Sequence, residues 1–374
     1  MSGVKVGVVG VGNCASGIIQ GVYLRKSGHR EAVKYGNDKI GKYGIEDLEF
    51  VSAFDVGANK IGKPLSKAIY QPPNVVDWVD SIPSTEAVVM ESPALDGVGI
   101  FVDNKVKPLK DGKSAARLRG AILDQLKDTK TEVLVNYLPV GSQKATEFWA
   151  DVALEAGVGM VNCMPVFIAS RREWADRFTE RNLPIVGDDV KGVVGATIVH
   201  RTLAQLCADR GVEITKTYQI NVGGNTDFLN MKEASRLESK KISKTEAVQD
   251  VLRERLPDHR IYVGPSDFIP FLGNTKLAFI RVEGKMFPGV PFNMEVRLEV
   301  DDKANSAGVV VDAIRYCKVA LDRKIGGPLL APSAWLMKHP PMPMNDDVAQ
   351  ANARAWLEGD ASTVPTQRRI SRHS

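Results

Sequence analysis

The chain has 374 residues, about twice the size of a typical domain, so two lobes are expected. Its 44% hydrophobic and 25% charged residues are typical of globular proteins and exclude collagenous, disordered and disulfide-scaffold classes. A net charge of +4 is too small for this length to indicate nucleic acid as a partner. No apolar run reaches the roughly 18 residues of a membrane-spanning helix, and no signal peptide is recognised. We therefore expect a cytoplasmic protein without membrane contact, whose four cysteines are reduced core thiols.

Short β-branched runs alternate with amphipathic helical segments over the first 200 residues, which is typical of a parallel sheet with crossover helices. Strands are predicted over Lys5–Val9, Phe50–Phe54, Ala87–Glu91, Val133–Leu138, Met160–Cys163 and Ile185–Val186. The clearest helices are predicted over Ala115–Lys127, Gln143–Ala156 and Arg171–Arg181. The polar stretch 25–47 between the first helix and the second strand is interpreted as a surface loop or lid.

The pattern changes near residue 215, where alternating strands around a Pro-Gly turn predict an antiparallel sheet. These strands are expected over Tyr218–Val222, His259–Val263, Lys276–Glu283 and Asn293–Val300, and a long helix over Asn305–Lys324 follows the turn residues Asp301 and Asp302. The predicted class is α/β, a Rossmann-like doubly wound parallel sheet with an inserted α+β domain. Its parts are the Rossmann-like domain at 1–202 and 304–360, the inserted domain at 203–303, and a disordered basic tail at 361–374.

The first strand leads into the sequence Gly10-Val11-Gly12-Asn13-Cys14-Ala15, a GxGxxA fingerprint between a strand and a helix. Gly10 permits a tight turn, Gly12 lets the backbone approach a pyrophosphate, and the small Ala15 lets the helix pack closely on the sheet. The helix N-terminus then supplies free N–H groups for phosphate. A dinucleotide site that includes Asn13 and Cys14 is therefore favoured over a merely tight turn.

Asp55 ends the second predicted strand, where the acid that holds the adenosine ribose is expected. It follows Gly10 by 45 residues instead of about 20, and the 25–47 insertion accounts for the excess. Because a carboxylate repels a 2′-phosphate, NAD is favoured over NADP. The alternative, that Asp55 only caps the following turn, stays open.

Seven further motifs occur in the order found in one enzyme family. They are NYLPVGS at 136–142, GDDVK at 187–191, GGNTDFLN at 223–230, ESKKISKT at 238–245, NTK at 274–276, NSAG at 305–308 and WLMK at 335–338. Together with the glycine fingerprint, they make residues 4–340 resemble myo-inositol-1-phosphate synthase, most closely its shorter bacterial and archaeal branch.

The resemblance implies an NAD-dependent isomerase that converts D-glucose 6-phosphate to inositol phosphate, for inositol and phospholipid biosynthesis. It also implies that the Rossmann-like domain binds NAD and that the inserted domain at 203–303 serves catalysis and oligomerisation. The family oxidises C5 of the open-chain sugar, enolises at C6, closes the ring by aldol attack on C1 and returns the hydride to C5. Each step develops negative charge on oxygen, which lysine ammonium groups stabilise.

The family's catalytic lysines fall on Lys240, Lys244, Lys276 and Lys338. By resemblance, Lys240 is expected to transfer the proton at O5, and Lys338 and Lys276 to serve the C1 oxygen and the enolate. Lys244 also has an independent argument, because Ser243-x-x-Glu246 is a capping box that places Lys244 in the first turn of a helix, which suits phosphate. A solvated surface charge is the alternative for any single lysine.

The resemblance also extends to acids. Asp227 and Asp302 match family acids in or near the site, although ordinary turn chemistry is the alternative, above all for Asp302. Asp188 and Asp189 match a loop that contacts the nicotinamide half of the cofactor, and the sequence leaves open which of them does so. Asn274 stands where many relatives carry an acid, which predicts a weakened polar contact to Lys276.

The metal requirement stays open, because some family members depend on a divalent or monovalent cation. His200 and His339 lack partners at ligand spacing and are expected in the core or at the surface.

Apolar residues on both faces of the inserted sheet favour a homotetramer, as in the resembling family; they are Leu277, Phe279, Ile280 and Val282. Two other functions stay open: an ordinary NAD-dependent dehydrogenase of a phosphorylated sugar, and a non-catalytic NAD-binding protein.

Overall fold

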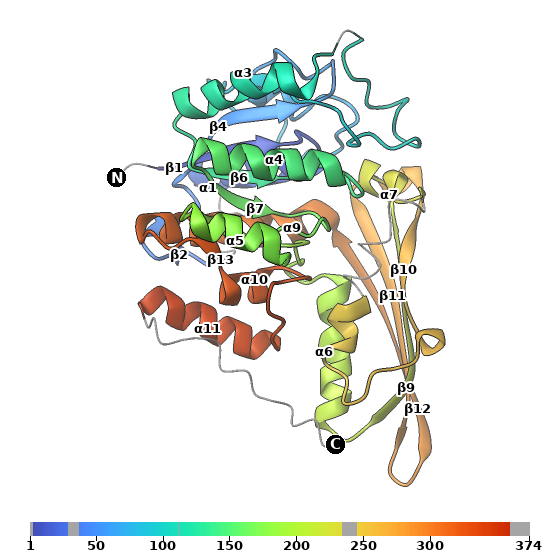
Figure 1. The fold of residues 1–374 in the computed structure, drawn as a ribbon. Coiled ribbons are helices and arrows are strands. Elements are labelled where there is room, and N and C mark those ends of the chain that lie inside the picture. The colour runs from blue at the N-terminus through green and yellow to red at the C-terminus, as the bar shows by residue number, and fades with distance from the viewer. Residues whose placement is uncertain (1–2, 29–36, 111, 234–244, 360–374) are drawn as a thin grey trace.

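Two β-sheets carry the fold in the computed structural model, which describes residues 3–28, 37–110, 112–233 and 245–359 (Figure 1). The larger sheet lies among helices, and the smaller one extends away from it as long, narrow strands (Figure 1). Among the described helices, none has both the length and the apolarity needed to cross a membrane. The predicted tail 361–374 lies outside the described residues.

The larger sheet has seven strands, and every neighbouring pair is parallel. In spatial order they are β13 (Gly327–Pro328), β8 (Pro184–Val186), β7 (Gly159–Asn162), β6 (Val133–Asn136), β1 (Val4–Val9), β4 (Leu48–Asp55) and β5 (Val89–Glu91). All six strands predicted for this region are confirmed. Only the two-residue β13 was missed, since its Gly-Pro sequence carries no strand pattern. The doubly wound α/β class is confirmed.

Helices cover both faces of this sheet, because apolar side chains point to both faces along its strands. Val6 and Val8 share a core with Ile18 of α1 (Asn13–Lys26) and Ile314 of α9 (Asp302–Asp322). Val9 instead belongs to the opposite core, which is built by α3 (Ala115–Asp128), α4 (Gln143–Ala156) and α5 (Arg172–Glu180). The other helices here are α2 (Leu65–Ala68), α10 (Leu330–Leu336) and α11 (Asp346–Glu358).

The smaller sheet has the order β10 (Ile261–Phe268), β9 (Glu213–Gly223), β11 (Thr275–Met286) and β12 (Val290–Asp301). The strand positions were predicted, but the prediction of an antiparallel sheet is wrong for one pair, because β10 runs parallel to β9. The connection from 224 to 260 includes α7 (Thr226–Asn230) and helical residues 245–249, and a crossover of this length is what parallel pairing needs.

Helix α6 (Ala196–Asp209) packs along one face of the smaller sheet, as Figure 1 shows. Cys207 contacts the buried side chains of Ile280 and Val282, which point from β11 toward the helix. These strands and α6 begin and end within or beside the predicted inserted domain at 203–303, whose boundaries stay a prediction.

The interpretation of 25–47 as a surface loop is wrong for its described second half. Strands β2 (Lys39–Ile40) and β3 (Tyr43–Gly44) form a hairpin against α9, and Ile40 and Tyr43 are only 3% and 5% exposed. These two large apolar side chains anchor the hairpin, although the residues between them hide the pattern. The first half, 29–36, lies outside the described residues.

Strand β12 passes into α9 without a linker. The helix begins at Asp302, three residues before the predicted start, because the Asp301 carboxylate caps it by accepting the N–H groups of Lys303 at 3.0 Å and Ala304 at 2.8 Å. Asp302 therefore lies where the smaller sheet joins the larger one.

Arg315 secures the hairpin from inside α9. It is fully buried, pairs with Asp312 and donates to the carbonyls of Asn37 at 2.9 Å and Tyr43 at 3.3 Å.

Arg315→Met should lower the free energy of unfolding, measured by urea denaturation, by about 3–5 kcal/mol, because Asp312 stays buried without its cation. The exposed Arg297–Glu299 pair is the control, and Arg297→Met should cost at most about 1 kcal/mol. Equal losses would contradict this account.

His200 gives the fold a pH dependence. Its ring lies between Thr217 at 2.6 Å and Gln219 at 3.3 Å, and burial lowers its pKa from 6.5 to about 4. As the pH falls, the unfolded chain binds a proton at this histidine before the folded chain does. The contribution of His200 to the free energy of unfolding is therefore complete above pH 6.5, and about 3 kcal/mol of it is lost as the pH falls toward 4. His200→Gln should flatten unfolding free energy against pH in this window. The exposed His259→Gln variant should keep the wild-type slope.

Candidate active site

The glycine loop between β1 and α1 has the backbone that the fingerprint predicts. Gly10 has φ +87°, and a Cβ there would lie 2.8 Å from the carbonyl oxygen of Tyr137, so only glycine fits. At Gly12, the N-cap of α1, nothing lies within 4 Å of the position of a Cβ. Ala15 is fully buried. The loop thus leaves open space in front of a helix N-terminus, as a bound phosphate requires.

Asp55 ends β4 beside this loop. Its carboxylate accepts the N–H groups of Val11 and Gly57, both at 2.7 Å, so the side chain is fixed against the glycine loop. Lys60, which no sequence motif marks, donates to the carbonyl of Val11 at 2.8 Å and is 4% exposed. Burial lowers the pKa of Lys60, and the nearby Asp55 offsets part of the effect.

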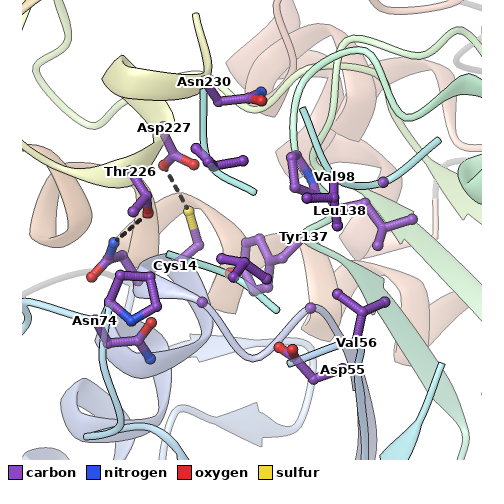
Figure 2. Close-up of a pocket in the computed structure, with 18 of the residues that line it drawn as sticks. Cys14, Asp55, Val56, Asn74, Val98, Tyr137, Leu138, Thr226, Asp227 and Asn230 are labelled. Carbon is purple, nitrogen blue, oxygen red and sulfur yellow. Dashed lines mark hydrogen bonds between the residues drawn. The ribbon is translucent and has the colours of Figure 1, made fainter. Parts of the chain in front are cut away.

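Helix α7, which follows strand β9 of the smaller sheet, faces the glycine loop across a pocket (Figure 2). Asn13 donates to the Thr226 hydroxyl at 3.2 Å, and the Cys14 thiol lies 4.0 Å from Asp227. The Asn225 side chain caps α7 by accepting the N–H groups of Asp227 and Phe228. Predicted cofactor residues and a predicted catalytic acid therefore line one pocket, with Asp55 at its other end (Figure 2).

A cluster of lysines and carboxylates lies behind Asp227. Lys276 of β11 lies 3.3 Å from one oxygen of Asp302, and Lys303 lies 2.9 Å from the other oxygen and also pairs with Asp227. Burial alone would raise the pKa of Asp302, but the ammonium groups of Lys303 and Lys276 hold it well below its usual range. The structure thus joins three predicted site residues through a lysine that was not predicted.

Lys303 is buried, with 3% of its side chain exposed. Burial would lower its pKa, but Asp227 and Asp302 outweigh that effect and hold it well above the usual value. In the sequence it follows two acids at the start of a helix, where a solvated charge is the ordinary interpretation. Pairing with the α7 acid comes only from the tertiary fold, so no sequence signal marked it.

A second lysine–carboxylate pair joins Lys338 to Asp189 at 3.0 Å, and the Lys338 ammonium also donates to the carbonyl of Val190 at 2.5 Å. The neighbouring Asp188 is fully buried and accepts five hydrogen bonds, three from the backbone N–H groups of 168–170 and two from the side chains of Asn162 and Ser170. Burial raises the pKa of Asp188 to about 6. Asp188 therefore shapes the loop, whereas Asp189 holds a lysine.

Two thiols lie between the two lysine pairs. Burial raises the pKa of Cys14 to about 11, and the charges of Lys303 and Asp227 act on it in opposite directions. Burial also raises the pKa of Cys163 well above its usual value, and Cys163 is within electrostatic reach of Cys14, Asp189 and Lys338. All four cysteines are free, as expected, although Cys14 is half-buried at the pocket rather than in the core.

Several predicted residues have other surroundings. Asn274 donates to Asp301 at 2.7 Å, while the carboxylate partner of Lys276 is Asp302. His200 lies in the core as expected, and the ring of His339 stacks on Phe167 at 4.0 Å. In the described part of the chain, no three His, Cys, Asp or Glu side chains gather where they could share a metal ion.

Lys240, Lys244 and Ser243 lie outside the described residues, so their predicted roles stay predictions. Glu246, the other half of the predicted capping box, forms two hydrogen bonds with Arg255 at 2.5 and 2.7 Å. That side chain is therefore engaged on the C-terminal side of its helix.

The fold and the site define a class: a Rossmann-like α/β protein with a second sheet whose lysine–carboxylate cluster adjoins the glycine-loop pocket at Asp227. Residues 195–303 match the family described as myo-inositol-1-phosphate synthase. The chain is 46% identical over 362 residues to inositol-3-phosphate synthase of Mycolicibacterium smegmatis, covering 95% of this chain and 98% of that one. The chain belongs to the inositol-phosphate synthase family.

Two other proteins show the same likeness. Inositol-3-phosphate synthase of Corynebacterium glutamicum is 45% identical over 363 residues, covering 95% of this chain and 98% of that protein. The crystal structure of a myo-inositol-1-phosphate synthase-related protein from Thermotoga maritima superposes with a TM-score of 0.78 at 26% identity, covering 95% and 98% of the two chains. The resemblance inferred from the motifs is confirmed.

Proposed function

We propose that the chain converts D-glucose 6-phosphate to myo-inositol 1-phosphate, also called 1D-myo-inositol 3-phosphate, with NAD as the cofactor. The observation that carries the proposal is that Asp227, which lines the pocket at the glycine loop, joins this pocket through Lys303 to the Lys276–Asp302 pair. A redox cofactor beside a set of ammonium groups suits a reaction that oxidises a sugar and then stabilises oxyanions. The family membership of the whole chain supports the same reaction.

The described residues fit a bound dinucleotide. The open space at Gly12 and the N-terminus of α1 suit its pyrophosphate, and the fixed Asp55 carboxylate suits the adenosine ribose. Asp189 and its loop are assigned to the nicotinamide half, because the carboxylate of Asp188 already accepts five hydrogen bonds. When bound, NAD supplies a reversible hydride acceptor.

The chain's own residues then manage charge and protons. Lys276 and Lys338 each stand next to one carboxylate and are proposed to stabilise the enolate and the C1 oxygen. Asp227 and Asp302 hold the lysines in place. By resemblance, Lys240 transfers the proton at O5. Lys244 is proposed to bind the substrate phosphate, on the capping-box argument given above.

Two alternatives predict different products. An ordinary dehydrogenase releases its ketone and one reduced cofactor per turnover, whereas a non-catalytic NAD-binding protein releases nothing. The absence of a His–Asp pair at the pocket, in the part of the chain that the structure describes, weighs against the first alternative. Buried lysine–carboxylate pairs, which are costly to keep, weigh against the second.

The fate of the C5 hydrogen tests the function. If hydride leaves C5 and returns to it, a small amount of NAD should support many turnovers without accumulating NADH absorbance. Glucose 6-phosphate deuterated at C5 should give a cyclic product that keeps its label even with unlabelled NADH in solution. Lys276→Met is the inactive control, with a rate loss of roughly 10²–10⁴. Steady NADH production or washout of the label would instead support the dehydrogenase.

Asp55 should determine the choice of cofactor. Asp55→Ala should weaken NAD binding by about 1.5–3 kcal/mol in calorimetry, since a charged acceptor for the ribose is lost. The variant should also discriminate less strongly between NAD and NADP, because the repulsion of a 2′-phosphate is removed. Wild-type preference for NADP would show that the assignment of Asp55 is wrong.

The assembly is proposed to be a homotetramer. On the smaller sheet, Phe279 and its register partner Ile220 are 40% and 43% exposed, and Tyr262 of β10 is 45% exposed. An exposed apolar group of this kind is typical of an interface. The Phe279→Asp variant should have a smaller sedimentation coefficient than the wild-type tetramer. A stable, active wild-type monomer would contradict this proposal.

The remaining expectations belong to the same proposal. The protein is expected in the cytoplasm, with a small-molecule substrate and neither nucleic acid nor membrane as a partner. A divalent or monovalent cation stays open as a further cofactor, and activity after chelation and dialysis against defined salts would decide it.

A further inference from the structure

Lys303 is the residue of the lysine–carboxylate cluster to which the proposed reaction assigns no role. It is the most buried lysine of the cluster, with 3% of its side chain exposed against 22% for Lys276. Its stem packs on α1, since a Cβ at Gly17 would lie 3.1 Å from the Cβ of Lys303. Burying an ammonium group is costly unless carboxylates compensate for the lost water. Its position therefore needs an explanation beyond packing.

Among the described residues, the charges around Lys303 balance. Asp227 of α7 and Asp302 of α9 supply two negative charges, and Lys303 and Lys276 supply two positive ones. The other groups that face the cluster from the described part of the chain are the Cys14 thiol of α1, the Asn225 amide, which donates to Asp302 at 3.1 Å, and the Phe228 ring, 5.8 Å from the Lys276 ammonium. All three are uncharged at neutral pH, because burial keeps the Cys14 thiol protonated.

Asp302 is shared between the two lysines. One carboxylate oxygen faces Lys276 at 3.3 Å, and the other faces Lys303 at the shorter distance of 2.9 Å. Lys303 therefore takes up much of the charge of Asp302 and of Asp227. Without it, Lys276 would be the one ammonium group beside Asp302 among the described residues, and a proton on Lys276 would be held more strongly.

We propose that Lys303 is a positioning residue: its ammonium is a fixed counter-ion of Asp227 and Asp302 and thereby keeps Lys276 free to exchange a proton with the substrate. The inference rests on the proposed function for its activity readout alone. Its electrostatic part concerns Lys276 itself and can be measured without substrate.

Competitive acetylation with trace acetic anhydride, read by mass spectrometry, measures the reactivity of Lys276 against pH in the full-length protein. In Lys303→Met, the midpoint of the Lys276 curve should move up by about one pH unit, because a neighbouring positive charge is lost. Lys303→Gln should give the same shift, and Lys303→Arg, which keeps the charge, should leave the midpoint in place. The pH limb of kcat that belongs to Lys276 should move with the midpoint.

Lys318 offers a matched control on the same helix. It is also buried and also pairs with two carboxylates, Asp322 at 2.5 Å and Glu132 at 3.0 Å, but it lies four turns away from Lys303. Lys318→Met should lose stability without moving the Lys276 midpoint. An equal shift in Lys318→Met would show general loosening and would overturn the proposal.

An unchanged Lys276 midpoint in a folded Lys303→Met or Lys303→Gln protein would also overturn it. Should neither neutral variant fold, Asp227→Asn tests the opposite sign: with one carboxylate fewer, Lys303 pairs more fully with Asp302, and the Lys276 midpoint should fall. No fall would overturn the proposal. A shifted midpoint in a protein that makes no inositol phosphate would refute the proposed function and leave the role of Lys303 intact.

Discussion

Buried carboxylates where the smaller sheet joins the larger one must be neutralised, and the arrangement of the site depends on that requirement. Asp302 stands at the direct passage from β12 to α9, with 15% of its side chain exposed. Its partners come from β11 and α9, and Lys303 extends the network to α7 and α1. Because a buried charge without a partner is strongly destabilising, this network fixes four elements relative to the glycine loop.

Much of the fold could be predicted because its elements are long and regularly patterned. The six main strands of the parallel sheet and helices such as Gln143–Ala156 follow from periodicity alone. The direction of β10 did not follow, because a strand pattern is the same in either direction and only the intervening crossover decides it. The hairpin at 39–44 was missed because its two buried side chains, Ile40 and Tyr43, make too short a pattern and its contact with Arg315 comes only from the tertiary fold.

Site residues could be predicted where the local backbone favours one residue type. Gly10 has a positive φ that favours glycine, and Asp55 at the end of its strand accepts the N–H group of Val11. Lys303 had no such reason, since its partner Asp227 is 76 residues away in the sequence. The distinction between Asp188 and Asp189 also needed the fold, because adjacent acids have the same local chemistry but different surroundings.

The neutral thiols between the lysine pairs complete the electrostatic argument. A thiolate at Cys14 would compete with any substrate oxyanion for the ammonium groups of the site, and it would add a third negative charge beside Asp227. Burial raises the pKa of Cys14 to about 11 and that of Cys163 well above its usual value, so both remain uncharged at neutral pH. The side chains of Lys276 and Lys338 are only 22% and 14% exposed, and a partly buried ammonium group acts on an oxyanion more strongly than it does in water. In the proposed reaction, developing charge therefore meets lysines whose own counter-ions are already fixed, so little reorganisation is needed when the charge appears.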